Sequence, residues 1–265
     1  MIGRWLRWLG RTFAAPDRID EDAWHALLES SPLFQRLTAQ EGTALRALAE
    51  RFLAGKRFTA AAEHALTDAQ CLALAALACL PVLHLGFEWL AGWREVIVYP
   101  GEFRVKREHH DEGSGVVTES EDDLIGEAWE RGPLILSWAD VATDLEHPFD
   151  GFNVVAHEIA HKLDMLDGAV DGVPRLPPHI SRHEWLAAMQ PAYDALVRAV
   201  ERGRDSMIDP YAAESVDEYF AVVSELHFSD PQLLRRAAPA VGALLQRFYG
   251  PSKHATLVAA TESDR

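Results

Sequence analysis

The chain has 265 residues, of which 48% are hydrophobic, so it is long enough for one large core or for a catalytic domain with a smaller appendage. It carries 25 Lys and Arg against 41 Asp and Glu, which gives a formal net charge of -16. Nucleic acids and anionic membranes are themselves negatively charged, so this acidic balance argues against general binding to either. It is compatible with a basic protein as a partner.

The N-terminal segment, residues 1–13, mixes three arginines with tryptophan, leucine and phenylalanine. No uninterrupted apolar run follows it, so we do not expect a secretory signal peptide. We expect an arm that docks on the body or is disordered; an amphipathic helix that touches a membrane surface or a partner is the alternative. The most apolar run, residues 71–85, is interrupted by Pro81 and is too short to span a bilayer. We therefore expect a soluble, cytoplasmic protein with no membrane contact.

The two cysteines, Cys71 and Cys79, lie in this apolar run. Eight residues of helix would separate them by about 12 Å, which is beyond the reach of a disulfide bond. They also lack the C-x-x-C spacing of a zinc or redox site. We predict buried, reduced thiols in a reducing compartment.

The first part of the chain is predicted to be helical. Residues 20–58 carry leucine and phenylalanine at helical spacing, and Thr38 and Glu41 have the spacing of a capping box. Thr67 begins a further helix, which runs through the cysteines to Leu80.

Two strands are predicted after these helices. Glu95–Tyr99 is rich in β-branched residues and is followed by Pro100, which stops it, and Gly132–Trp138 gives a second strand signal. Phe103–Val105 is expected to pair with the first of these strands.

The segments around the second strand are predicted to be irregular. Residues 106–123 are polar and acidic, which is typical of a long exposed loop, and we expect His109 and His110 to be solvent-exposed there rather than metal-bound. Residues 139–148 are expected to form a connection.

The motif H-E-x-x-H, at His157 to His161, is the main functional signal. On a helix with about 3.6 residues per turn, positions four apart share a face, so both histidines can bind one metal ion. Glu158 is then turned by roughly 100° and can reach a metal-bound water without binding the metal. Asn153 is a plausible N-cap of this helix, and Gly168 a plausible stop. Two surface histidines on an ordinary helix are the alternative interpretation.

The remainder of the chain is predicted to be helical with loops between. The predicted helices cover residues 183–202, 212–228 and 233–248, and residues 167–178 form a loop rich in glycine, proline and aspartate. His179 and His183 are also four apart, but no acid stands between them as a general base, so we expect them to face solvent.

A third ligand is needed, because catalytic zinc takes three protein ligands and leaves a fourth position for water. The helix after Tyr211 offers Glu214, Asp217, Glu218 and Glu225. Spacing alone does not choose among these acids. The apolar residues around Glu218 indicate a buried position, whereas acids near the helix start are also favoured by the helix dipole.

Several stretches together resemble the Mlc titration factor A (MtfA) family of bacterial peptidases, over roughly residues 20–250. The matching segments are Cys79–Leu83, Leu85–Leu90, Val98–Pro100, Gly151–Asn153, His157–Asp164, Asp209–Ala213 and Glu218–Glu225. The resemblance implies one zinc ion per chain, with His157, His161 and Glu218 as ligands, Glu158 as general base and Tyr211 as a catalytic residue. The tyrosine and glutamate also resemble those of the catalytic domain of anthrax lethal factor, which implies that Tyr211 assists the oxyanion.

The implied chemistry is peptide hydrolysis by a zinc-activated water, with short peptides or exposed N-termini as substrates and aminopeptidase activity expected. The resemblance also implies binding to the repressor Mlc, titrating it from its operator and so regulating genes of the sugar phosphotransferase system. The alternative is a non-catalytic protein that binds a repressor and has a structural zinc site. Asp164 and Glu225 are candidate acceptors for the outer nitrogens of the histidines, or partners in ordinary salt bridges.

The expected fold class is α+β, a mainly helical, zincin-like (gluzincin) metallopeptidase with a small mixed β-sheet beside the active-site helix. We expect an N-terminal arm at 1–19, one domain at 20–250 and a flexible tail at 251–265. Within the domain, the helical part covers about 20–93 and the catalytic part about 94–250.

Overall fold

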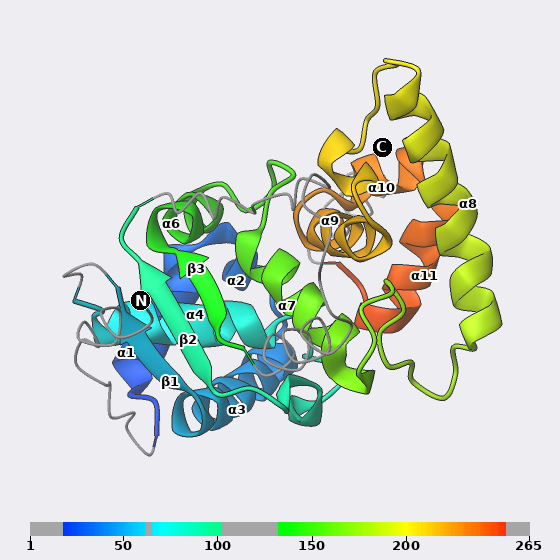
Figure 1. The fold of residues 1–265 in the computed structure, drawn as a ribbon. Helices are drawn as coiled ribbons and strands as arrows, with labels where there is room; N and C mark the ends of the chain where they lie inside the picture. Colours follow the sequence, from blue (N-terminus) through cyan, green and yellow to red (C-terminus); the bar gives the residue numbers. More distant parts are fainter. Residues whose placement is uncertain (1–17, 62–64, 102–131, 253–265) are drawn as a thin grey trace, which may run out of the picture.

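The computed structural model describes residues 18–61, 65–101 and 132–252. Within these residues, a small three-stranded sheet lies with the N-terminal helices, and the C-terminal helices form a separate group (Figure 1). The α-helices are α1 (Glu21–Ser30), α2 (Pro32–Gln35), α3 (Ala39–Gly55), α4 (Asp68–Cys79), α6 (Trp138–Glu146), α7 (Val154–Asp164), α8 (Arg182–Glu201), α9 (Val216–Ser229), α10 (Pro231–Ala237) and α11 (Pro239–Tyr249). Short 3₁₀ helices are η2 (Phe87–Leu90), η3 (Met165–Asp167) and η4 (Pro210–Ala213), and the strands are β1 (Arg57–Ala60), β2 (Glu95–Tyr99) and β3 (Leu134–Ser137).

The sheet has the order β1-β2-β3, and its described strands are all parallel, with Phe58 opposite Val96 and Ile97 opposite Ile135. The α+β class is confirmed, but the mixed sheet that we expected does not occur among the described strands. The predicted pairing of Phe103–Val105 lies outside the described residues, as do His109 and His110. Parallel strands need a crossover, and α4 supplies it between β1 and β2.

The predicted capping box at Thr38 and Glu41 is present. Thr38 Oγ1 accepts a hydrogen bond from Glu41 N at 3.2 Å, and Glu41 Oε2 accepts one from Thr38 N at 2.9 Å. Thr67 begins α4 with a second box. Both motifs satisfy donors that the first turn of a helix leaves unpaired, which is why they can be recognised in the sequence.

Helix α4 is buried along its whole length from Cys71 to Cys79, so it is a central helix rather than an amphipathic surface helix. Both cysteines are buried and free, as predicted. Burial raises the pKa of the Cys71 thiol to about 12, so the thiol stays protonated and unreactive at neutral pH.

Four predicted segments differ from the structure. The helix predicted for 212–228 begins only at Val216, after η4 and the N-cap Ser215. Residues 139–148, expected as a connection, form α6, which Ser137 caps by accepting a hydrogen bond from Asp140 N. The end of the helical region 20–58 is strand β1 instead. The single helix predicted for 233–248 is two helices, because Pro239 lacks the N–H that would continue α10.

Helix α7 lies between two groups of elements (Figure 1). It packs on α4, α6 and β3 on one side and, most extensively, on α9 on the other. The buried apolar side chains from Ile19 to Tyr249 form one contiguous cluster around it. None of the helices in the described ranges is long and apolar enough to cross a membrane.

Candidate metal centre

The start of α7 is held by three polar side chains. Asn153 is its N-cap, as predicted, and its Oδ1 accepts a hydrogen bond from Ala156 N at 2.9 Å. Asp144 Oδ2 accepts from Val154 N at 2.7 Å, and Glu225 Oε1 accepts from Asn153 N at 2.6 Å. Carboxylates suit the positive end of a helix dipole, so these contacts fix the position of the first turn.

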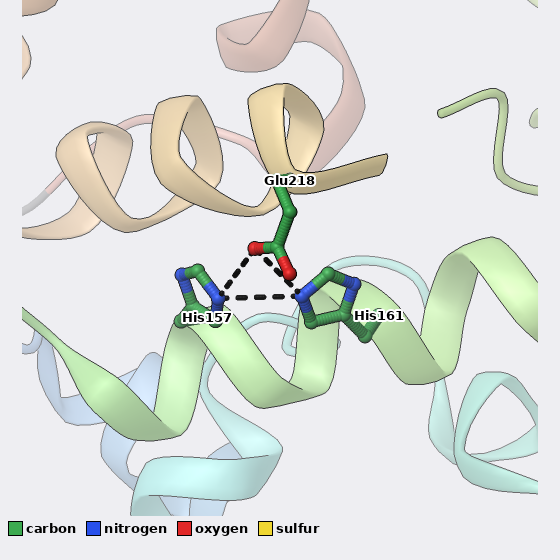
Figure 2. A group of neighbouring side chains, drawn as sticks. All are labelled: His157, His161 and Glu218. Atoms are coloured by element: carbon green, nitrogen blue, oxygen red, sulfur yellow. Dashed lines mark hydrogen bonds and ion pairs between the residues drawn. The ribbon is translucent and has the colours of Figure 1, made fainter. Parts of the chain in front are cut away.

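Three side chains converge one turn further along (Figure 2). The Nε2 atoms of His157 and His161 lie 3.2 Å apart, and Glu218 Oε2 lies 3.3 Å from each of them. Ligands 2.0–2.1 Å from a tetrahedral zinc ion are about 3.3 Å from one another, so this triangle has the size of one face of a zinc site. Two imidazoles and one carboxylate also form a common donor set of catalytic zinc.

The four acids that spacing left open lie in different positions relative to the histidines. Glu218 lies in the first turn of α9, and only 5% of it is exposed, next to the buried Tyr219 and Phe220. Glu214 is exposed on the surface. Asp217 and Glu225 lie at the other side of the imidazole rings, so only Glu218 completes the triangle with both Nε2 atoms.

The outer nitrogens of both histidines face carboxylates. His157 Nδ1 lies 3.4 Å from Glu225 Oε2, and His161 Nδ1 lies 3.9 Å from Asp217 Oδ2. Such partners orient an imidazole so that the other nitrogen is presented to a metal ion. Of the two acceptors considered from the sequence, Glu225 is in place, while Asp164 accepts a hydrogen bond from Gly172 N instead.

Asp217 was not proposed as an acceptor from the sequence. The signal that could have found Glu225 is its position seven residues after Glu218, two helical turns along the same face of α9. Asp217 has no such spacing signal, because its position near His161 Nδ1 depends on how α9 packs against α7.

Glu158 and Tyr211 lie beside the triangle. Glu158 is half-buried and lines a cavity of about 510 Å³ together with His157. Tyr211 is on η4, and its ring centroid lies 6.3 Å from that of His157. Asp209 caps η4 by accepting a hydrogen bond from Tyr211 N at 2.9 Å. The structure thus brings all five predicted site residues into one region.

The cavity is strongly acidic. Besides His157 and Glu158 it is lined by Asp140, Thr143, Asp144, Asp150, Phe152, Val154 and Glu225. Burial raises the pKa of Asp144 to about 7 against the effect of its hydrogen bond from Val154 N, whereas Asp150 is exposed. Phe152 also borders this cavity and is 60% exposed. We did not identify Asp140, Asp144, Asp150 or Phe152 from the sequence, in part because α6 was expected as a connection.

Elsewhere in residues 18–61, 65–101 and 132–252, no second group of three or more His, Cys, Asp and Glu side chains is placed to hold a metal ion. His179 and His183 are exposed, as predicted.

An α+β fold with the H-E-x-x-H histidines on one helix, α7, and a glutamate on a later helix, α9, that packs against it is the arrangement of a metallopeptidase. Residues 5–250 match the model of the family described as "Glucose-regulated metallo-peptidase M90", and the chain belongs to this family. The resemblance derived from the motifs is therefore confirmed.

Similar proteins carry the name Mlc titration factor A. The protein of Escherichia fergusonii is 36% identical over 249 residues, which is 92% of this chain and 91% of that protein. Those of Salmonella gallinarum and Salmonella paratyphi B are each 41% identical over 221 residues, 82% of this chain and 80% of theirs.

We expect Glu218→Ala to weaken zinc binding roughly 100-fold or more, because it removes the carboxylate from the triangle. Glu214→Ala, an exposed acid four residues earlier, should leave the zinc Kd within about twofold. Competition with a chromophoric chelator measures both values. The ligand choice is wrong if Glu214→Ala releases the metal and Glu218→Ala does not.

Proposed function

We propose that this protein is a zinc-dependent peptidase in which His157, His161 and Glu218 hold one zinc ion per chain. The observation that carries the proposal is the convergence of two Nε2 atoms and one carboxylate oxygen at 3.2–3.3 Å. Three buried or half-buried polar groups at this spacing would be costly without a cation to share. Membership of a metallopeptidase family supports the same interpretation.

The roles of the neighbouring residues follow from their positions. His157, His161 and Glu218 would hold the zinc ion, which would supply Lewis-acid activation of a water molecule at neutral pH. Glu158 borders the cavity next to His157 and accepts the proton of the water, which it later passes to the leaving amine. The Tyr211 hydroxyl donates a hydrogen bond to the oxyanion that forms, a contribution of about 2–4 kcal/mol where water is excluded.

A catalytic zinc ion fits better than a structural one. Structural sites are usually closed by a fourth protein ligand, whereas catalytic sites keep one position for water. Among the described residues, the group of potential ligands has three members, and one of them, His157, borders the cavity. This opening is what a substrate and a water molecule require.

The acidic lining of the cavity favours an aminopeptidase. The protonated α-amino group of a peptide is a cation, and Asp140 and Asp150 border the cavity beside the proposed general base, Glu158. Coulombic attraction to these carboxylates would hold a free N-terminus next to the metal. Peptides or proteins with exposed N-termini are therefore the proposed substrates.

A second role is favoured by the names of the similar proteins, Mlc titration factor A, which point to Mlc as the partner of those proteins. We extend this role to the present chain, as a cytoplasmic protein that captures an Mlc-type repressor and so regulates sugar phosphotransferase genes. The net charge of -16 suits the basic surface with which a repressor binds DNA. The acidic stretch 108–123 lies outside the described residues. Repressor binding without catalysis is the alternative function.

Glu158→Gln is expected to keep one zinc ion per chain and to lower kcat by about 10²–10⁴-fold. The amide has the shape of the carboxylate but cannot accept the proton of the water. Metal analysis together with assays on chromogenic aminoacyl and peptidyl substrates measures both properties, with the exposed Glu214→Gln as control. Near-normal turnover with full zinc content would exclude Glu158 as the general base.

Substrates with a free α-amino group are expected to be cleaved in preference to their N-acetylated forms. Asp150→Asn should raise the KM of the free-amine substrates about 3- to 10-fold, because it removes one negative charge from the cavity. The Asn side chain can still accept the hydrogen bond that Asp150 Oδ1 receives from Phe152 N, and the exposed Asp205→Asn is the charge-matched control. Equal cleavage of acetylated substrates would contradict the aminopeptidase assignment.

Repressor capture is expected not to depend on catalysis. We expect Glu158→Gln to bind an Mlc-type repressor with the affinity of the wild type, and the affinity of both to fall as salt rises. Calorimetry at two salt concentrations measures this. Loss of binding in the variant would place the docking surface at the active site, and salt-independent affinity would remove the electrostatic argument.

A further inference from the structure

Gly172, in the loop between η3 and α8, is the point at which three elements meet. Its N–H donates a hydrogen bond to Asp164 Oδ2 at 3.0 Å, and its carbonyl oxygen accepts one from Trp185 Nε1 at 2.9 Å. Asp164 is the last residue of α7, three residues after His161, and Trp185 lies in the second turn of α8. Both side chains are completely buried.

The third element is α9. Gly172 has a φ of +69°, a backbone conformation that side chains with a Cβ rarely adopt. A Cβ added at this position would lie 2.5 Å from the carbonyl oxygen of Val216 and 3.0 Å from its carbonyl carbon. Val216 is the first residue of α9, two residues before Glu218. Only glycine therefore allows the loop to approach the start of α9 this closely.

We propose that Gly172, fixed by Asp164 and Trp185, is a positioning residue that sets the distance between the end of α7 and the start of α9, and with it the spacing of His161 and Glu218. The inference rests on the proposed metal site. The proposal gives the loop around Gly172 a role in metal binding. Neither the sequence motifs nor the three proposed ligands include this loop.

The contacts between α7 and α9 explain why such a residue is needed. At the start of α7, Glu225 of α9 binds the helix directly, through Asn153 N and next to His157 Nδ1. At the other end, the contact runs from Asp164 through Gly172 to Val216. The two helices are thus tied at two points, and the ligand triangle lies between them.

Burying the Asp164 carboxylate at this position is energetically unfavourable. It is a carboxylate at the C-terminal end of a helix, where the helix dipole is unfavourable to negative charge. Its Oδ1 has no hydrogen-bond partner among the described residues, and burial raises the pKa of the carboxyl to about 7. The hydrogen bond that Asp164 accepts from Gly172 N is the contact that compensates for this unfavourable burial.

Gly172→Ala and Gly203→Ala form a matched pair for the test. Gly203 has a similar φ of +61°, but a Cβ added there meets nothing within 4 Å. Both variants carry the strain of a positive φ, and only Gly172→Ala pushes against the backbone of Val216. We expect the zinc Kd of Gly172→Ala to rise at least tenfold and that of Gly203→Ala to stay within twofold of the wild type, measured by chelator competition below the melting temperature of each variant.

The visible absorption of the cobalt-substituted proteins gives an independent readout, because it reports the geometry of the ligands rather than the stability of the fold. We expect a changed spectrum for Gly172→Ala and an unchanged one for Gly203→Ala. A zinc Kd within twofold of the wild type for Gly172→Ala, or an equal loss in both variants, would overturn the positioning role.

Asp164 provides a second pair if Gly172→Ala does not fold. The Asn side chain of Asp164→Asn can still accept a hydrogen bond from Gly172 N, so its zinc Kd should stay within threefold, whereas Asp164→Ala should bind about tenfold more weakly. Equal zinc affinity of these two variants would overturn the inference. If the wild type bound no zinc, both the proposed metal site and the positioning role would be wrong. If the wild type bound zinc and Gly172→Ala bound it normally, only the positioning role would be wrong.

Discussion

The site depends on one contact, the packing of α7 against α9. The two histidines four residues apart on α7 provide two of the three potential metal ligands, and Glu218 from α9 provides the third. The three groups are polar and only slightly exposed, so bringing them together opposes folding unless a cation joins them. On the proposed function, zinc binding and the docking of α9 on α7 therefore stabilise each other, since an ion that binds only the folded state shifts the folding equilibrium toward it.

Carboxylates hold α7 at both ends, but the physics differs between the ends. At its start, Asp144 and Glu225 accept backbone N–H groups at the positive end of the helix dipole, where negative charge is favourable. At its end, Asp164 is unfavourable to the dipole and has one described hydrogen bond, to Gly172. The first end is stable through local interactions, whereas the second depends on a loop that is correctly placed by the rest of the fold.

The residues of the site were predictable from the sequence to the extent that their relations are local. His157, Glu158 and His161 follow from helical spacing, and Asn153 and Thr38 from caps that act within one turn. Spacing alone could not separate Glu218 from Glu214, because the choice depends on how α9 docks on α7. Glu218 was favoured by the apolar residues around it and by the family resemblance. Strand β1 was missed for a similar reason, since its four residues are a strand only through pairing with β2. Helix α6 was not predicted, although Ser137 and Asp140 have capping spacing. The segment lies between a predicted strand and the H-E-x-x-H helix, and it was expected to be a connection between them.

The acidic side chains of the site have three different roles, which can be distinguished by their contacts. Glu218 faces both Nε2 atoms, so on the proposed function its charge is offset by the metal ion. Asp144 and Glu225 have backbone N–H partners, and their negative charge is offset by the start of α7. Asp140 and Asp150 accept no hydrogen bond from α7 and border the cavity, where Asp150 is exposed to solvent. Their field is not offset by the helix, so it is available to attract a cation from solution, and the α-amino group of a peptide is the cation that a peptidase meets.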